Sequence, residues 1–170
     1  MSLEQLWAAW RSDYVAAVDS GTDLDAVGGC VFCALIEGSA PGAASQVVHQ
    51  DANSVVVLNA YPYTSGHVLV LPRRHVGDLA DLDEGEAVAL WAAARAAVGA
   101  ITSAYRPDGI NLGANLGKAA GAGLPDHLHL HVLPRWRGDT NFMTTVAGAR
   151  VLPEALETTG EKLRAAWSRP

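Results

Sequence analysis

Cysteine and charge are both scarce in this chain. Of its 170 residues only two are cysteines, and only 18% are charged. Two cysteines cannot build the disulfide framework of a small secreted domain, so we expect a cytoplasmic protein in a reducing compartment. No repeat, linker or low-complexity segment divides the chain, and 49% of it is hydrophobic. This length and composition predict a single domain over residues 1–170 with a substantial core.

The chain also lacks a basic excess, a targeting signal and an obvious membrane segment. Its formal charge of −6 and pI of about 5.4 argue against nucleic acid as a partner. An anionic ligand must therefore be bound by a local site. Glu4, Arg11 and Asp13 interrupt the stretch after Met1, so we expect no signal peptide. We also expect no segment long and apolar enough to span a bilayer, and no membrane partner.

Hydrophobic patterning predicts an α+β fold with a mostly antiparallel sheet of about five strands, a long helix and flanking helices. The expected strands are residues 46–49, 54–59, 67–71, 109–113 and 127–134. Asp83 can cap a helix that ends near Tyr105, with Glu86 completing a capping box. Its buried face should contain Leu90, Trp91, Ala94 and Val98. Flanking helices are expected at residues 3–10 and 153–167.

Three of the six histidines of the chain alternate with apolar residues in the last predicted strand. His127, His129 and His131 should share one face, because side chains alternate across a strand, at about 6.5 Å for every two residues. The residues between them, Leu128, Leu130 and Val132, should pack into the core on the other face. The sequence therefore predicts a cluster of imidazoles on one side of the sheet.

Such a cluster favours phosphate chemistry. Three charged imidazoles this close would repel one another, so some should be neutral near pH 7. A neutral imidazole can attack phosphorus while a neighbour assists the leaving oxygen. Two alternatives stay open: a strand whose polar face happens to be histidine, and a zinc site formed by the triad itself.

A segment rich in glycine and alanine precedes the histidines. Asn115, Gly121 and Gly123 lie in it, and backbone N–H groups of such a loop can approach phosphate oxygens. It can equally be an ordinary connection. Five cations lie in or beside the segments described so far: Arg73, Arg74, Lys118, Arg135 and Arg137. His67, at the start of the third strand, is expected to support the sheet or the triad.

The two cysteines, Cys30 and Cys33, have the spacing of a zinc knuckle without a second Cys-x-x-Cys. His75 and His127 are the candidate partners for a structural Cys₂His₂ zinc site. The alternative is a pair of small buried thiols, with His75 binding phosphate or packing. If zinc takes His127, that histidine is not available for proton transfer.

The histidine pattern and the loop before it resemble the histidine triad (HIT) superfamily. The likeness covers about residues 30–142 of the domain, and the motif His-φ-His-φ-His-φ-φ stands at residues 127–133. Cys30-Val-Phe-Cys33 and Leu133-Pro-Arg-Trp-Arg-Gly-Asp-Thr-Asn-Phe142 further resemble the branch of bacterial diadenosine-tetraphosphate phosphorylases and HIT hydrolases.

The resemblance implies a HIT-like fold and a nucleotidyl-enzyme mechanism. His129 would attack the α-phosphate of a nucleotide or dinucleoside polyphosphate, and His131 would organise the phosphate and the leaving group. Water or inorganic phosphate would then release the nucleotide. Asn59 would lie against the ribose hydroxyls, and Asn115 matches the loop asparagine of the family.

The resemblance also implies a homodimer and, in a related branch, zinc held by two cysteines, a histidine after a strand and the first histidine of the triad. It leaves open whether Mg²⁺ accompanies the substrate. One departure counts against full activity, because the family often carries a hydroxyl or amide side chain where this chain has Ala122-Gly123 or Gly123-Leu124. A nucleotide-binding protein with little catalysis and a zinc-dependent hydrolase are therefore kept as alternative functions.

Overall fold

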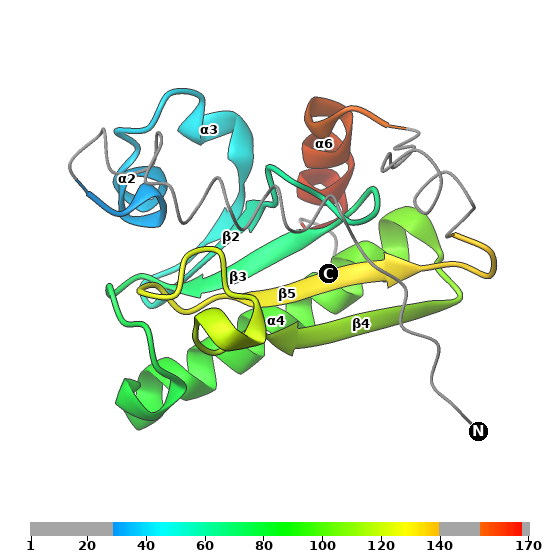
Figure 1. Cartoon of the computed structure of the whole chain (residues 1–170). Helices are drawn as coiled ribbons and strands as arrows, with labels where there is room; N and C mark the ends of the chain where they lie inside the picture. The colour runs from blue at the N-terminus through cyan, green and yellow to red at the C-terminus, as the bar shows by residue number, and fades with distance from the viewer. Residues whose placement is uncertain (1–28, 140–153, 168–170) are drawn as a thin grey trace, which may run out of the picture.

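The sheet has five strands, and every pair of neighbours in it runs antiparallel. The computed structural model describes residues 29–139 and 154–167. The strands are β1 (Val47–Gln50), β2 (Ser54–Leu58), β3 (Val68–Pro72), β4 (Gly109–Ala114) and β5 (Leu130–Arg135), in the spatial order β1-β2-β3-β5-β4 (Figure 1). This confirms the predicted α+β class and strand number. The helix expected at residues 3–10 lies outside the described residues.

Four α-helices and two 3₁₀ turns occur in the described residues besides the sheet. They are α2 (Val31–Glu37), α3 (Ala43–Gln46), α4 (Glu84–Tyr105) and α6 (Leu156–Trp167), with 3₁₀ turns η2 (Leu79–Asp81) and η3 (Lys118–Ala120). The predicted capping box at the start of α4 is present. Glu86 N–H donates to Asp83 Oδ1 at 2.8 Å, and Asp83 N–H donates to Glu86 Oε2 at 3.0 Å. Helices α2 and α3 were not predicted; α3 falls where a loop was expected.

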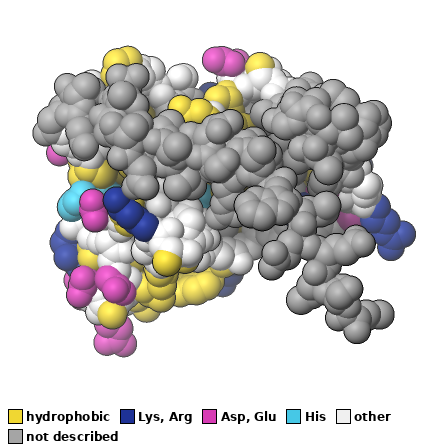
Figure 2. All heavy atoms as spheres, in the orientation of Figure 1, with side chains coloured by type: hydrophobic (Ala, Val, Ile, Leu, Met, Phe, Trp, Pro, Cys, Tyr) yellow, Lys and Arg dark blue, Asp and Glu magenta, His cyan; other side chains and the backbone are white. Residues whose placement is uncertain are grey.

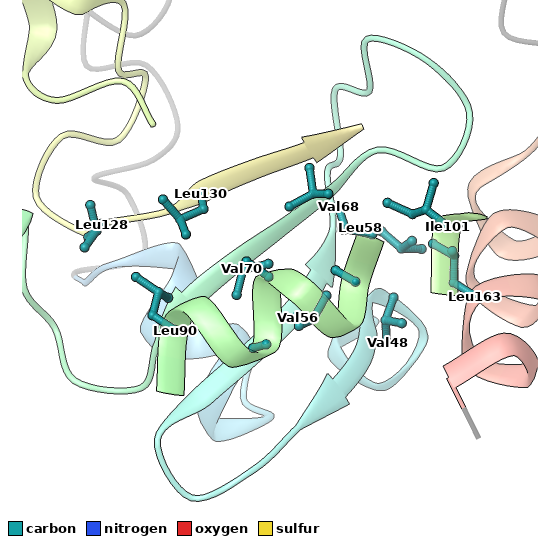
Figure 3. Close-up of a cluster of buried hydrophobic side chains, with 14 residues drawn as sticks. Val48, Val56, Leu58, Val68, Val70, Leu90, Ile101, Leu128, Leu130 and Leu163 are labelled. Atoms are coloured by element: carbon teal, nitrogen blue, oxygen red, sulfur yellow. The ribbon is translucent and has the colours of Figure 1, made fainter. Parts of the chain in front are cut away.

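One face of the sheet carries the larger apolar core (Figure 3). Alternate residues of β2 and β3 point to this side and pack against α4 and α6. The labelled members of this cluster are Val48, Val56, Leu58, Val68, Val70, Leu90, Ile101, Leu128, Leu130 and Leu163. We call this side the α4 face.

The other set of alternate residues forms a second apolar cluster. Val55, Val57, Leu69 and Leu71 pack there against α2, which contributes Phe32 and Leu35. We call this side the α2 face. Because both faces are covered, β2 and β3 are buried at every residue, which explains why their sequences are apolar apart from Ser54 at the start of β2.

One predicted core residue of α4 is wrong. Trp91 is 54% exposed, whereas Leu90, Ala94 and Ile101 are completely buried. Successive residues of a helix are about 100° apart, so a stripe through Leu90, Ala94 and Ile101 turns Trp91 away from the sheet.

We also expected no segment long and apolar enough to span a bilayer. Judged only by length and composition, one helix meets these criteria, so that expectation is wrong. Helix α4 has 22 residues and is apolar enough to meet both requirements. Its Leu90, Ala94 and Ile101 are nevertheless buried against the sheet. Core packing thus accounts for the apolar side of this helix.

The last strand begins later than predicted. β5 pairs with β4 only from Leu130, which lies opposite Ala114. His127 and His129 therefore precede the strand, in a segment where Leu128 N–H donates to the Val76 carbonyl at 2.6 Å. Leu128 packs in the core of the α4 face, so side chains keep alternating through this segment.

Candidate active site

The three histidines of the motif lie together on the α2 face, as the alternation predicted. Leu128, Leu130 and Val132, which separate them, all belong to the core of the α4 face. His127 is 1% exposed and His129 is 8% exposed. The rings of His129 and His131 have centroids 5.1 Å apart. The ring of Phe32 lies 5.5 Å from that of His127 and 5.2 Å from that of His129, so α2 covers the first two histidines.

A backbone carbonyl fixes the proton of His127. Its Nε2 lies 3.0 Å from the oxygen of Pro72, which can only accept, so Nε2 carries the hydrogen. Nδ1 then has the free lone pair and faces two sulfurs, Cys30 Sγ at 3.4 Å and Cys33 Sγ at 3.7 Å. Burial, aided by His75 and His129, lowers the pKa of His127. This histidine is neutral and presents Nδ1 as a ligand atom.

His129 is held in the opposite tautomer. Its Nδ1 donates to the carbonyl oxygen of His127 at 2.8 Å, so its lone pair is on Nε2. Burial lowers the pKa of His129, which favours the neutral imidazole at pH 7. A neutral, oriented Nε2 is the form of histidine that can act as a nucleophile.

The proton of His131 is set through a second histidine. Tyr63 N–H donates to His67 Nδ1 at 3.0 Å, so neutral His67 carries its hydrogen on Nε2 and donates it to His131 Nδ1 at 3.0 Å. His131 must then carry its own hydrogen on Nε2. Burial, and then the neighbouring His129, lower the pKa of His131 to about 4. His67 therefore supports the triad, which is one of the two roles that we expected for it.

The Nε2 atom of His131 is buried and has no hydrogen-bond partner among the residues that the structure describes. A buried N–H without an acceptor costs free energy, and such groups are rare unless a ligand completes them. An anionic oxygen beside His129 would satisfy this donor. The three histidines therefore offer three different atoms: a ligand, a nucleophile and a hydrogen-bond donor.

The loop residues predicted to bind phosphate begin beside the triad. Ala114 pairs with Leu130, which places the next residue, Asn115, near the start of β5. Asn115 Nδ2 donates to the Gly121 carbonyl at 3.5 Å, across the loop. Gly121 has a φ of 91°, a left-handed conformation that L side chains rarely adopt. The position of the loop supports a role for Asn115, Gly121 and Gly123, which stays a prediction.

Asn59, predicted to contact a ribose, lies against His67. Its Oδ1 accepts a hydrogen bond from Tyr61 N–H at 3.0 Å, and its Nδ2 lies 3.3 Å from Nδ1 and 3.4 Å from Nε2 of the His67 ring. The amide is therefore already engaged on both of its ends.

The four predicted metal ligands meet in one cluster. The ligand atoms of Cys30, Cys33, His75 and His127 all lie within 4.8 Å of one another, and no other such group of three or more occurs in residues 29–139 and 154–167. Cys33 Sγ is 3.3 Å from His75 Nδ1. The cluster joins α2 to the segments after β3 and before β5.

The chemistry of this cluster fits a cation. Burial and the neighbouring Cys30 thiol raise the pKa of Cys33 to about 11, because two thiolates cannot ionise side by side without a compensating charge. A bound Zn²⁺ supplies that charge, and two sulfurs with two imidazoles are a standard tetrahedral set for it. The hydrogen bond from His127 to Pro72 is the outer contact that metal-bound histidines usually make.

The cations near the site are less available than the sequence suggested. Arg74 forms two hydrogen bonds with the carboxylate of Glu86, at 2.7 and 2.8 Å. Arg135 does the same with Asp139, at 2.6 and 2.8 Å. Figure 2 also shows acidic side chains gathered at the lower left of the molecule, near the start of α4. These two guanidinium groups are therefore already paired with carboxylates of this chain.

Two contributors to the site were not predicted from the sequence. Phe32 covers His127 and His129, and the backbone N–H of Tyr63 orients His67. Phe32 stands between the two cysteines in the sequence, but a helix turns residues one or two positions apart to different sides, so this spacing alone carried no signal of its role. A backbone N–H leaves no sequence signal.

Comparisons with known proteins agree with this geometry. Residues 41–138 match the HIT domain. AP-4-A phosphorylase of Mycobacterium tuberculosis is 36% identical over 167 residues, which are 98% of this chain and 86% of that protein. A Zn-bound histidine triad family protein from Mycobacterium smegmatis is 35% identical, with a TM-score of 0.69 over 83% of this chain and 94% of that chain. A hypothetical histidine triad nucleotide-binding protein from Sulfolobus tokodaii is 28% identical, with a TM-score of 0.68 over 81% and 91%.

Proposed function

Because this chain belongs to the HIT domain family, we propose that it is a nucleotidyl hydrolase or transferase that cleaves nucleoside polyphosphates at the α-phosphate through a covalent bond to His129. The observation that carries the proposal is the hydrogen bond of 2.8 Å from His129 Nδ1 to the His127 carbonyl, which leaves the lone pair on Nε2. The similarity to AP-4-A phosphorylase supports a dinucleoside polyphosphate as the substrate.

The reaction takes place in two displacements at phosphorus. In the first, His129 Nε2 forms a P–N bond to the α-phosphate while the P–O bond to the rest of the phosphate chain breaks. In the second, an oxygen of water or of inorganic phosphate attacks the same phosphorus and the P–N bond breaks. Water releases a nucleoside monophosphate, and inorganic phosphate releases a nucleoside diphosphate. Splitting one difficult step into two is the usual advantage of a covalent nucleophile.

His131 assists without carrying a positive charge. Its neutral Nε2–H lies beside the nucleophile and can donate to a phosphate oxygen or to the leaving oxygen. Hydrogen-bond donors aimed at developing negative charge stabilise the transition state, most strongly in a buried site. We propose that Asn115 and the backbone of Gly121 and Gly123 hold the remaining phosphate oxygens, and that Mg²⁺, if the substrate brings it, neutralises the outer phosphates.

Zinc would have a structural role. Cys30, Cys33, His75 and His127 would hold it, and it would supply the positive charge that two neighbouring thiolates need. By joining α2 to the segment before β5, this ligand set fixes the residue whose carbonyl orients His129. His127 then contributes to catalysis through its backbone and not through proton transfer.

The zinc-dependent hydrolase is a weaker alternative. The ligand cluster includes only His127 of the triad, so His129 and His131 are not ligands in it. A chelator distinguishes the two cases. If zinc takes part in the chemistry, turnover stops as soon as zinc is removed. If zinc is structural, its removal lowers stability, and the molecules that remain folded still turn over substrate.

The second candidate function is nucleotide binding with little catalysis. The observation in its favour is Ala122-Gly123, which offers no side-chain hydroxyl or amide, and Ala122 is itself buried. A missing donor would slow the release of the leaving group and would leave binding intact. A protein of this kind binds a nucleotide and forms no covalent adduct.

We also propose a homodimer. β4 is at the edge of the sheet, and an edge strand offers unpaired backbone groups to a partner. Leu112 in β4 is 40% exposed, Leu116 just beyond it is 45% exposed, and Val88 and Trp91 on the outer side of α4 are 64% and 54% exposed. Sedimentation of the native chain and of Leu112→Asp tests this, with a dimer expected for the first and a monomer for the second. A native monomer at micromolar concentration would contradict it.

A product screen tests the proposed function itself. Diadenosine polyphosphates and a nucleotide phosphoramidate are incubated with the full chain, with and without inorganic phosphate, and the products are separated. A hydrolase should form a nucleoside monophosphate when no inorganic phosphate is added. A phosphorylase should form a nucleoside diphosphate only when inorganic phosphate is present. Absence of turnover for every substrate, with nucleotide binding retained, would instead establish the binding protein.

A further inference from the structure

We propose that Cys30 and Cys33 are a reversible redox pair. A low-molecular-weight disulfide converts the two thiols into an intramolecular disulfide, which cannot hold zinc and so disconnects His127 from both sulfurs. The inference goes beyond the structural role given to zinc above. It rests on the proposed function only for its effect on turnover, because the new bond and the release of zinc can be followed without any substrate.

The two sulfurs are placed so that they can bond to each other. Cys30 is the residue before α2, and Cys33 is in the first turn of that helix. Residues three apart in a helix lie on the same side, and the two Sγ atoms lie within 4.8 Å of each other. Rotation of the two side chains can close that gap. The sequence contains no third cysteine, so a disulfide within one chain must join this pair.

A small oxidant can reach the cluster from the side of His75. His75 is exposed and both cysteines are partly exposed, whereas His127 is 1% exposed. A surface cavity of about 680 Å³ extends to His75 and is also lined by Asp126. Accessible cysteines exchange with disulfides, whereas fully buried ones are inert. The placement of this pair therefore suits thiol–disulfide exchange.

The exchange takes place in two steps. The thiolate of one cysteine attacks a sulfur of oxidised glutathione, which forms a mixed disulfide and releases one glutathione thiolate. The second cysteine attacks the protein sulfur of the mixed disulfide, forms the bond between Cys30 and Cys33, and releases the second glutathione thiolate. Two electrons pass from the protein sulfurs to glutathione. Zn²⁺ is released without a change of charge, because metal ligation requires thiolate sulfurs and the disulfide has none.

Oxidation replaces a long-range connection with a local one. The four ligands connect the start of α2 to His75 after β3 and to His127 before β5. A bond between two residues three apart connects this segment only to itself. His127 then keeps its hydrogen bond to Pro72 but loses the link from Nδ1 to the sulfurs. The carbonyl of His127 orients His129, so oxidation should lower turnover.

The experiment titrates the 170-residue chain in glutathione buffers of increasing oxidising strength. It is done at two saturating concentrations of free zinc that differ about tenfold. Intact mass after an acid quench detects the loss of two hydrogen atoms, and a chromogenic chelator measures the zinc released. Each disulfide formed releases one Zn²⁺, so the higher zinc concentration should raise the midpoint ratio of oxidised glutathione to the square of reduced glutathione about tenfold.

Two histidine variants show whether this zinc dependence belongs to the cluster. His75→Ala removes one ligand and keeps both thiols, so its midpoint should respond much less to zinc. His49→Ala is the matched control, because His49 lies on β1 and is not a member of the cluster. Its midpoint should respond as in the native chain. Cys33→Ser should form only a mixed disulfide with glutathione at Cys30.

The effect on function is measured with the same oxidised protein. Turnover of diadenosine tetraphosphate should fall about tenfold, because a small displacement of a nucleophile slows reaction, and reduction in the presence of zinc should restore it. A midpoint that does not respond to zinc, zinc retained after oxidation, or unchanged turnover would overturn the proposal. So would a native chain that forms only the mixed disulfide. If the reduced native chain turns over no nucleotide, the proposed function fails, and the midpoint and the zinc release alone still support or overturn the redox pair.

Discussion

The two faces of the sheet are built from the same strands and differ in what they bury. The α4 face buries aliphatic side chains from six elements, and its buried members among the described residues are all hydrophobic. The α2 face has a smaller apolar cluster, and beside it lie three histidines, His67 and the pair of cysteines. Within residues 127–132, neighbouring side chains point to opposite faces of the sheet. Every second one is a core residue of the α4 face, and the histidines between them are the candidate catalytic residues on the α2 face.

This difference separates stability from chemistry. The buried members of the apolar cluster on the α4 face include no titratable side chain and no candidate metal ligand, so this hydrophobic packing does not itself respond to pH or metal. On the α2 face every imidazole of the triad is oriented by a carbonyl, a neighbouring ring or a cysteine. Buried polar groups are usually paired, and here each pairing also sets a tautomer, while the Nε2 of His131 is left for a ligand.

The largest expected effect is on the α2 face. His129→Ala removes the nucleophile and should lower turnover on the order of 10⁴-fold or more, with the free energy of unfolding changed by about 1 kcal/mol or less. Steady-state kinetics and urea unfolding measure the two quantities. The matched control is His49→Ala, because His49 lies on β1 and stacks on Trp167 at 4.7 Å. Turnover in His129→Ala close to that of the control would refute the nucleophile.

The converse change is on the α4 face. Leu90 is completely buried there, so Leu90→Ala should lower the free energy of unfolding by about 2–5 kcal/mol. Turnover per folded molecule should stay within about twofold of the native value. Urea unfolding gives the stability, and kinetics at a temperature well below the new midpoint give the turnover. A loss of turnover in protein that is still folded would mean that the faces are not independent.

Loss of the metal cluster should have an intermediate effect. Cys33→Ser removes one of four ligands and should abolish stoichiometric zinc binding, which costs roughly 2–3 kcal/mol of stability if zinc is present at about 100 times its Kd. Hydrogen exchange should increase in α2 and in the segment before β5, and not in α4. Ser39→Ala, an exposed change just after α2, serves as the control. Uniform exchange across both faces would contradict a local role.

The smallest effect is the pH dependence of stability. Burial lowers the pKa of His127 and His129, and burial with His129 lowers that of His131 to about 4. Between pH 6.5 and about 4 the unfolded chain binds protons that these native histidines do not, so stability should fall as pH falls through this window and be constant above it. Urea unfolding from pH 4.5 to 7.5 measures the slope. His131→Gln should make the slope shallower; an unchanged slope would show that His131 is not buried neutral.

The sequence predicted the class of fold and the strand number, and it named the four side chains that meet in the Cys/His cluster. The alternation of His127, His129 and His131 with apolar residues correctly predicted that the three histidines share one face, because side-chain alternation requires only an extended backbone. The beginning of β5 at Leu130 could not be predicted, because it depends on where β4 ends its pairing. Trp91 was misplaced because the stripe of α4 depends on the angle at which the helix crosses the sheet.

The finer features of the site were beyond the sequence. The tautomers of the histidines depend on the carbonyls of Pro72 and His127 and on the N–H of Tyr63, which are backbone groups present in every residue. The ion pairs of Arg74 and Arg135 likewise depend on which acidic residues the fold brings near them. Sequence patterns identify chemical groups and their faces, whereas three-dimensional pairing decides which atoms are free.

One measurement tests the role of His129 most directly. The 170-residue chain is mixed with diadenosine tetraphosphate, quenched within milliseconds to seconds, and analysed by intact mass and by sequencing of the peptide that contains residues 127–135. We predict a transient adenylyl adduct on His129 through Nε2, formed and lost at rates compatible with turnover, and absent from His129→Ala. Turnover that proceeds with no adduct, or an adduct on His127 or His131, would contradict the account.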